Sequence, residues 1–217
     1  MSLPPKLPDA IFNILDVWYQ NGIVVGGVGS DTLENLIEIS VNYISVIHRY
    51  FSIENDISIV DFGSGIGIPG LIMACFTPNW KYSLLDSMSR RTRVAEEAII
   101  ELALQEQVDV LLGRAEELVS PLRHSFDVVV ARCFASPPLL MELCIPYVRE
   151  GGLIVVSEPP SIATEVRWSA SALGKLGLDY PQVFIESGRR YAAFVVRRSV
   201  ALKPRSFAQI RKTPLWT

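Results

Sequence analysis

Residues 59–70 decide the expected fold, and they read Ile59-Val60-Asp61-Phe62-Gly63-Ser64-Gly65-Ile66-Gly67-Ile68-Pro69-Gly70. An apolar run typical of a buried strand comes first, then closely spaced glycines, then Pro69, which suits the first turn of a helix. Glycine lets the chain turn sharply and lets a ligand approach the backbone, because no Cβ is in the way. The stretch predicts a strand, a ligand-binding loop and a helix; the alternative is a tight strand–helix connection that binds nothing.

Short apolar runs alternate with longer helical patterns from residue 56 onward. This alternation predicts a doubly wound α/β fold, in which a mostly parallel sheet carries helices on both faces. Little more than residues 186–190 separates the last two strands, so we expect them to form an antiparallel hairpin. The expected strands cover residues 57–62, 82–85, 108–112, 126–131, 153–156, 183–185 and 192–196, and the expected helices between them cover residues 68–75, 89–104, 138–147 and 162–176.

The first 55 residues carry helical patterns. Asp9 is expected to cap a first helix that ends near Gly22. A second helix is expected to start after Ser30 or Asp31 and to run to about Tyr50. Neither helix would be stable alone, so both must pack on the rest of the chain. The expected organisation is an N-terminal helical cap at residues 1–55, a ligand-binding α/β domain at 56–200 and a basic C-terminal tail at 201–217.

An acidic residue strengthens the prediction of a ligand-binding loop. Asp86 ends the second expected strand, 23 residues beyond Gly63. At the carboxyl end of that strand it would lie beside the glycines and accept hydrogen bonds from ribose hydroxyls. The alternative is that Asp86 only caps the following helix. Together the two features indicate a cofactor that contains a nucleoside.

Asp61 bears on which cofactor this is. It precedes the glycines directly, where its carboxylate would repel the pyrophosphate of a dinucleotide. The same carboxylate can hold an ammonium or hydroxyl group, which fits the amino-acid end of S-adenosylmethionine. A Walker-type lysine is absent, which argues against nucleotide hydrolysis. We therefore expect S-adenosylmethionine, with a dinucleotide as the second choice, bound by Asp61, Asp86 and the loop glycines Gly63, Gly65 and Gly67.

Two further segments fall at the same edge of the expected sheet. Gly113-Arg114-Ala115-Glu116-Glu117 follows the third strand and is expected near the base of an adenosyl group, unless it is only a short capped helix. Arg132 follows the fourth strand and places a permanent cation at the mouth of the crevice. The alternative for Arg132 is a surface arginine that pairs with a carboxylate.

These motifs in this order resemble one family. The segments are Asp61–Gly70, Leu84-Leu85-Asp86-Ser87, Arg90-Arg91-Thr92-Arg93, Arg114-Ala115-Glu116-Glu117 and Arg132-Cys133-Phe134-Ala135-Ser136. They are similar to the bacterial ribosomal RNA small subunit methyltransferase G family, also called glucose-inhibited division protein B. The resemblance implies a class I (Rossmann-like) methyltransferase with a seven-stranded sheet. It also implies methylation of guanine N7 in small-subunit (16S) ribosomal RNA with S-adenosylmethionine.

The resemblance also implies roles for single residues. Gly63 and Ile68 would touch the cofactor, Ala115 and Glu116 would flank its adenine, and Arg132 would line the pocket. Arg114 and Arg190 match arginines expected to face cofactor or RNA. Guanine N7 is already a nucleophile, so we expect Arg132, Arg114 and Arg190 to orient the substrate and name no general base. The expected partner is ribosomal RNA or the small ribosomal subunit.

Two other functions stay open at this point. A small-molecule methyltransferase on the same fold is favoured by Glu158, which stands where the family usually has a Lys-Gly pair. Residues 37–43 favour it too, because they replace a basic segment of the family's N-terminal helices. A non-catalytic RNA-binding or ribosome-binding module is the third candidate.

Charge is distributed unevenly along the chain. The 217 residues include 20 basic and 23 acidic ones, and this net charge of −3 argues against a protein that coats nucleic acid with a basic surface throughout. Residues 187–217, however, contain eight basic and no acidic residues, which leaves residues 1–186 with a formal charge of −11. The pattern is that of a polarised protein that meets RNA on one side, or of a simple solvated face.

Composition limits the remaining classes of protein. A mean hydropathy of +0.29 and 49% hydrophobic residues exclude disorder and collagen. Three unpaired cysteines (Cys75, Cys133 and Cys144) and two histidines argue against disulfides and against a metal site. No apolar stretch reaches the roughly 20 residues of a membrane helix. We expect a cytoplasmic protein without metal or membrane contact, and the oligomeric state is left open.

Overall fold

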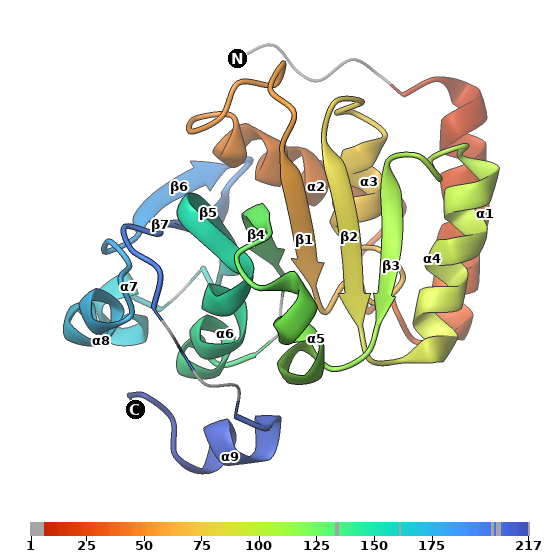
Figure 1. The fold of residues 1–217 in the computed structure, drawn as a ribbon. Helices are drawn as coiled ribbons and strands as arrows, with labels where there is room; N and C mark the ends of the chain where they lie inside the picture. The colour runs from red at the N-terminus through yellow and green to blue at the C-terminus, as the bar shows by residue number, and fades with distance from the viewer. Residues whose placement is uncertain (1–6, 133–134, 161, 201, 203–204, 217) are drawn as a thin grey trace.

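A computed structural model of the chain describes residues 7–132, 135–160, 162–200, 202 and 205–216. Its centre is one seven-stranded sheet of order β3-β2-β1-β4-β5-β7-β6 (Figure 1). All neighbouring strands are parallel except β7, which runs antiparallel to both β5 and β6. The predicted sheet and its C-terminal hairpin are therefore confirmed. The strands are β1 (Ser58–Phe62), β2 (Lys81–Asp86), β3 (Val108–Leu112), β4 (Phe126–Ala131), β5 (Val148–Glu158), β6 (Gln182–Glu186) and β7 (Arg189–Val195).

Helices cover both faces of the sheet because strand side chains alternate between the two faces. On β1, Ile59 joins one buried cluster, and Val60 and Phe62 join the other. The first cluster lies under α1 (Asp9–Val24), α2 (Leu33–Ile47), α3 (Gly70–Ala74) and α4 (Ser89–Glu101). The second lies under α5 (Ala115–Leu122), α6 (Pro137–Cys144), the one-turn η1 (Ile145–Tyr147), α8 (Ala170–Lys175) and α9 (Phe207–Lys212).

The two N-terminal helices are bonded to the loops at the carboxyl edge of the sheet. Trp18 of α1 is 2% exposed, and its indole nitrogen donates to the carbonyl oxygen of Ile66 at 2.8 Å. Tyr43 of α2 donates its hydroxyl to the carbonyl oxygen of Ala131, the last residue of β4, at 2.7 Å. These buried bonds hold the loops after β1 and β4 against the helices that cover them.

Several predicted helix ends were wrong by a few residues. Pro8, not Asp9, occupies the N-cap of α1, which continues past Gly22 to Val24. Thr32 caps α2 by accepting a hydrogen bond from the amide of Asn35, so neither Ser30 nor Asp31 does. That helix ends at Ile47 instead of Tyr50. Such ends depend on which hydroxyl reaches a free amide, which several neighbouring residues can do.

Two larger differences lie in the last quarter of the chain. The single helix predicted at residues 162–176 is broken into α7 (Thr164–Arg167) and α8, because Trp168 is extended and Ser169 caps α8. The tail was predicted only as a basic segment, yet it contains α9, and Ile210 of this helix is 1% exposed in the second cluster. Figure 1 shows α9 beyond the carboxyl edge of the sheet, below α5 and α6.

None of the helices among the described residues has both the length and the apolar character needed to cross a membrane.

Candidate active site

The connection between β1 and α3, residues 63–70, is called the glycine loop below. Gly63, Gly65 and Gly67 all have positive φ angles. At Gly67 a Cβ would come within 2.8 Å of Leu71 Cβ, and at Gly70 it would come within 2.7 Å of Leu84 and 3.0 Å of the Asp61 carboxylate. Glycine is thus required by packing at both positions, against α3 and β2 at Gly67 and against β1 and β2 at Gly70. At Gly67 the positive φ angle of the turn requires it as well. The loop is confirmed as a tight strand–helix connection, and its ligand binding stays a prediction at this point.

Asp61 is fully buried at the base of this loop. Its Oδ2 accepts a hydrogen bond from the amide of Gly70 at 2.8 Å, whereas its Oδ1 has no partner among the described residues. Burial raises the pKa of Asp61 to about 7; the bond from Gly70 opposes this rise, the charge of Asp86 adds to it, and Arg132 opposes it. A buried acceptor without a donor is costly, so this oxygen is suited to a ligand that brings a donor and a positive charge.

Asp86 ties the glycine loop to the end of β2. Its Oδ2 accepts from the amide of Gly65 at 2.9 Å, and its Oδ1 accepts from the amide of Met88 at 2.8 Å. It does not cap α4, whose N-cap residue is Met88, so the alternative given to Asp86 was wrong. Each carboxylate oxygen keeps a free lone pair, and Asp86 still has an acceptor for a hydroxyl group.

A cavity of about 330 Å³, here called the β2–β3 pocket, opens beside Asp86. It brings together five of the predicted site residues, Gly63, Asp86, Arg114, Ala115 and Glu116. Its other lining residues are Leu85, Ser87, Met88, Arg91, Gly113 and Phe207. Segments that follow β1, β2 and β3 therefore meet around one space, as expected for the carboxyl edge of parallel strands.

The amides of Gly67 and Ile68 form hydrogen bonds within the glycine loop. Both of their amides donate to the carbonyl oxygen of Ser64 at 2.8 Å, and the Ile68 side chain is buried in the first cluster. Neither amide is therefore free for a ligand. The Ser64 hydroxyl, in contrast, is buried without a partner among the described residues, which leaves an open polar group in the glycine loop itself.

A second cavity of about 740 Å³, here called the β4–β5 pocket, lies where β4, β5 and β7 meet. Arg132 and Arg190 line it, but Arg114 does not, so the three arginines predicted to orient the substrate are divided between two pockets. Arg132 forms an ion pair with Asp31, the alternative considered for it. Arg190 donates to the Thr164 hydroxyl at 2.9 Å.

Glu158 is the buried acid of the β4–β5 pocket. Its Oε1 accepts from the Trp168 indole at 3.0 Å and from Arg167 at 3.2 Å, and its Oε2 has no partner among the described residues. Burial raises the pKa of Glu158, and the charge of Arg167 opposes this rise. The lining of this pocket includes four arginines and two acids, so ion pairs within it balance only two of the four cations.

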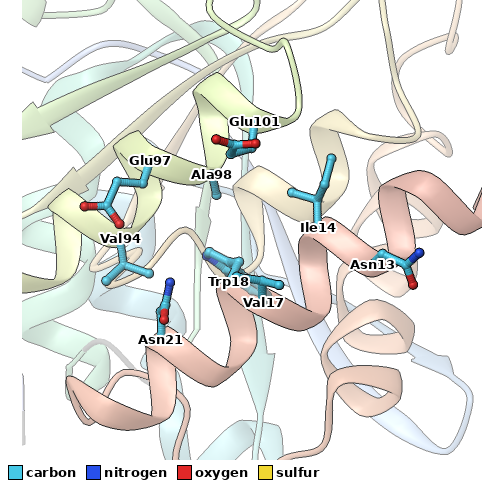
Figure 2. Close-up of a pocket in the computed structure, with 9 residues that line it drawn as sticks. All are labelled: Asn13, Ile14, Val17, Trp18, Asn21, Val94, Glu97, Ala98 and Glu101. Atoms are coloured by element: carbon cyan, nitrogen blue, oxygen red, sulfur yellow. The ribbon is translucent and has the colours of Figure 1, made fainter.

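A third cavity, of about 520 Å³, lies between α1 and α4 (Figure 2). Asn13 and Asn21 of α1 and Glu97 and Glu101 of α4 line it, with Trp18 among its apolar residues. It contains none of the predicted site residues. Within the described part of the chain, no three His, Cys, Asp or Glu side chains gather in a way that would hold a metal ion.

The family model described as rRNA small subunit methyltransferase G matches residues 21–181. The chain belongs to this family. A family member from Thermotoga neapolitana is 34% identical over 145 residues, which cover 65% of this chain and 63% of the relative. One from Clostridium kluyveri is 32% identical over 133 residues, which cover 60% of this chain and 56% of the relative. The chain thus spans little more than half the length of the curated relatives it matches.

Solved structures agree with this rRNA small subunit methyltransferase G fold. An S-adenosylmethionine-dependent O-methyltransferase from Thermotoga maritima superposes with a TM-score of 0.56 at 15% identity, covering 73% of this chain and 67% of the other. At this identity the likeness shows the fold alone, and the predicted Rossmann-like methyltransferase fold is confirmed.

The family match ends at residue 181, before β6, β7 and α9. Arg190 and Phe207 therefore lie outside the matched residues, although each lines a pocket. Phe207 was missed as a site residue, and so was Asp31, the partner of Arg132. The only local signal for Phe207 was the pair Ser206 and Gln209, which form a capping box at the start of α9. Nothing near Asp31 in the sequence indicates its contact with Arg132, 101 residues away.

Proposed function

We propose that this chain is an S-adenosylmethionine-dependent methyltransferase that methylates guanine N7 in small-subunit ribosomal RNA. Its membership of the rRNA small subunit methyltransferase G family carries this proposal. We assign the cofactor to residues 56–200, next to the helical cap at 1–55 and the basic tail at 201–217. Ribosomal RNA or the small subunit is the proposed partner.

The residues at the carboxyl edge suit this cofactor. The open Oδ1 of Asp61 suits an α-ammonium group, because an ionised donor and acceptor form the stronger class of hydrogen bond. Gly65 leaves room for a ligand, since a Cβ there would meet only Arg91, at 3.8 Å. Asp86 keeps acceptors for ribose hydroxyls, and Ala115 and Glu116 line the space left for adenine.

The protein has to position the guanine and the cofactor, and it does not have to transfer a proton. The bound cofactor supplies a sulfonium methyl group, and the N7 lone pair forms the new N–CH₃ bond while the electron pair of the S–CH₃ bond stays on sulfur. Guanine N7 carries no proton, so no general base is required. Arg132 and Arg190 would hold RNA phosphates or the guanine O6 edge in the β4–β5 pocket. The ion pair with Asp31 uses one guanidinium nitrogen of Arg132, so Asp31 competes with RNA for only part of this cation.

Methyl transfer from labelled S-adenosylmethionine tests the proposal. Purified chain is incubated with small ribosomal subunits, with naked small-subunit RNA, and with a small-molecule extract from bacterial cells. Label in RNA or subunits, absent with the Asp61→Asn variant, is the expected result. Tight cofactor binding without label in either RNA sample would overturn the ribosomal RNA assignment.

A small-molecule methyltransferase is the second candidate function. Glu158 favours this candidate, because its buried carboxylate has one oxygen without a partner in the β4–β5 pocket. A small cationic substrate would form an ion pair with that oxygen. In the same assay, label confined to the small-molecule fraction would support this candidate.

A further inference from the structure

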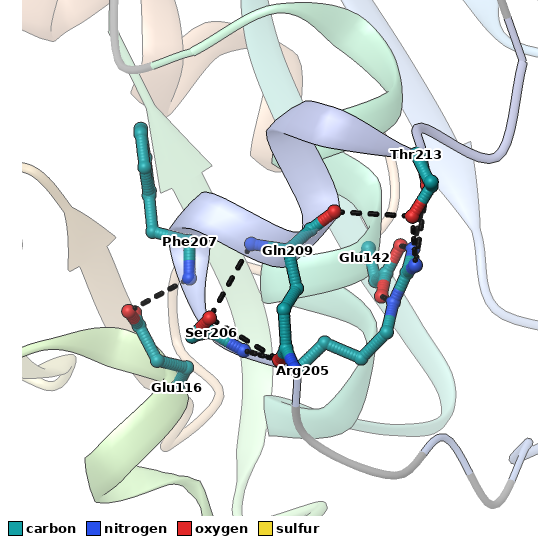
Figure 3. Close-up of polar contacts among 7 residues, drawn as sticks. All are labelled: Glu116, Glu142, Arg205, Ser206, Phe207, Gln209 and Thr213. Carbon is teal, nitrogen blue, oxygen red and sulfur yellow. Dashed lines mark hydrogen bonds and ion pairs between the residues drawn. The ribbon is translucent and has the colours of Figure 1, made fainter.

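Polar contacts join the C-terminal segment 205–216 to α5 and α6 (Figure 3). Arg205 forms a bidentate ion pair with Glu142 of α6, and its NH1 group also donates to the Thr213 hydroxyl at 2.9 Å. Ile210 of α9 is 1% exposed among the apolar residues of the second cluster. Polar and apolar contacts together therefore set the position of α9 relative to α5 and α6.

Phe207 is directed from this segment to the β2–β3 pocket. Its amide donates to Glu116 Oε1 at 3.0 Å, and its side chain extends away from α9 in Figure 3. The half-buried ring is part of the pocket lining that also contains Asp86 and Glu116. Glu116 thus has one carboxylate oxygen bound to the C-terminal segment at the place where adenine is expected.

We propose that Phe207 is a cofactor-binding residue, whose ring forms an aromatic wall against the adenine of S-adenosylmethionine. This inference rests on the proposed function. It adds a binding residue from outside the part of the chain that matches the family. Five of the ten other residues that line this pocket are polar or charged, and the ring of Phe207 offers a flat apolar face on which a purine can stack. The bond from its amide to Glu116 holds the ring in place, so docking of α9 and adenosine binding support each other.

Trp216 provides a matched control in the same segment. It is also half-buried, its indole nitrogen donates to the carbonyl oxygen of Arg167 at 3.3 Å, and its ring lies 6.4 Å from that of Trp168. These contacts help to hold the C-terminal segment in place, but Trp216 does not line the β2–β3 pocket. A role of α9 in stability alone would make variants at Phe207 and Trp216 behave alike, whereas a contact with adenine separates them.

Calorimetric titration of the full chain with S-adenosylhomocysteine and with 5′-methylthioadenosine tests the proposal. Phe207→Ala should weaken both ligands about tenfold or more, because both contain adenine. Phe207→Leu keeps the apolar bulk of the side chain and so guards against a folding defect, but it has no aromatic face. It should weaken the binding of both ligands by a smaller factor. Trp216→Ala should stay within about twofold of the unmodified chain.

Three outcomes would overturn the inference. In the first, Phe207→Ala and Phe207→Leu bind both ligands as the unmodified chain does. In the second, Trp216→Ala loses as much affinity as Phe207→Ala. In both of these cases the unmodified chain binds the cofactor, and the proposed function stands. In the third, the unmodified chain binds neither ligand, which overturns the proposed function itself.

Discussion

The two pockets at the carboxyl edge of the sheet are built in different ways. In the β2–β3 pocket, Asp86 is held by backbone amides of the glycine loop and of Met88. In the β4–β5 pocket, the pairs Arg132–Asp31 and Arg167–Glu158 are side-chain ion pairs. Backbone bonds hold a fixed shape, whereas a partly exposed ion pair such as Arg132–Asp31 exchanges partners at little cost. The first pocket is therefore shaped in advance for one ligand, whereas in the second Arg132 can exchange Asp31 for an anionic substrate.

The largest effect is expected at Asp61, which lies on β1 between the strands that line the two pockets. Asp61→Asn keeps an acceptor for the Gly70 amide but removes the charge next to a bound ammonium. Affinity for S-adenosylhomocysteine should fall about a hundredfold, because a charge-assisted hydrogen bond is replaced by an amide. Affinity for 5′-methylthioadenosine, which lacks the ammonium, should stay within about twofold. Calorimetry measures both, and an equal loss for the two ligands would show that the site is distorted instead.

The pH dependence of cofactor binding follows from the same carboxyl group. Its folded pKa of about 7 lies above its ordinary value of 3.8, so the folded chain retains a proton that the unfolded chain loses. Its contribution to stability therefore falls as the pH rises from about 4 to 7. Affinity for S-adenosylhomocysteine should rise about tenfold between pH 5.5 and 7.0 in the unmodified chain, because the ionised form is the one that binds the ammonium. A profile of the same slope in Asp61→Asn would contradict this assignment.

Variants at Arg132 and Asp31 test whether Arg132 can exchange its partner Asp31 for RNA. Arg132→Ala should weaken binding of small-subunit RNA about tenfold, because one cation for phosphate or guanine is lost. Asp31→Asn should strengthen it about threefold by freeing that cation. Filter binding at one salt concentration measures both variants, and calorimetry with S-adenosylhomocysteine serves as the control. A lower affinity for RNA in both variants would mean that the ion pair supports the pocket structurally.

The smallest effect is expected at Glu158. Gln at this position keeps an acceptor for the Trp168 indole and removes a buried charge with one oxygen that has no partner. The loss of the ion pair with Arg167 offsets part of this gain, so Glu158→Gln should change the thermal midpoint by only about 2 °C, in either direction. A decrease of more than about 6 °C in a melting curve would show that the carboxylate is a main support of the β4–β5 pocket.

Local patterns predicted the sheet and the β2–β3 pocket well, and long-range contacts account for what was missed. The glycine loop and Asp86 lie at consecutive strand ends, so chain order alone indicates that they meet. The pairing of Arg132 with Asp31 and the contact of Phe207 with Glu116 join segments 101 and 91 residues apart. The local pattern of apolar and polar residues contains no information about such contacts. The break in the helix predicted at 162–176 has a similar cause, because the Trp168 ring is buried against Phe194 and its indole bonds to Glu158.

The identity of the methylated base tests the central claim most directly. Small ribosomal subunits that lack the modification are incubated with S-adenosylmethionine and the chain, and their RNA is digested to nucleosides for mass spectrometry. We expect 7-methylguanosine with the unmodified chain and none with Asp61→Asn. A methylated nucleoside other than 7-methylguanosine, or no methylated nucleoside from a chain that binds the cofactor, would contradict the central claim.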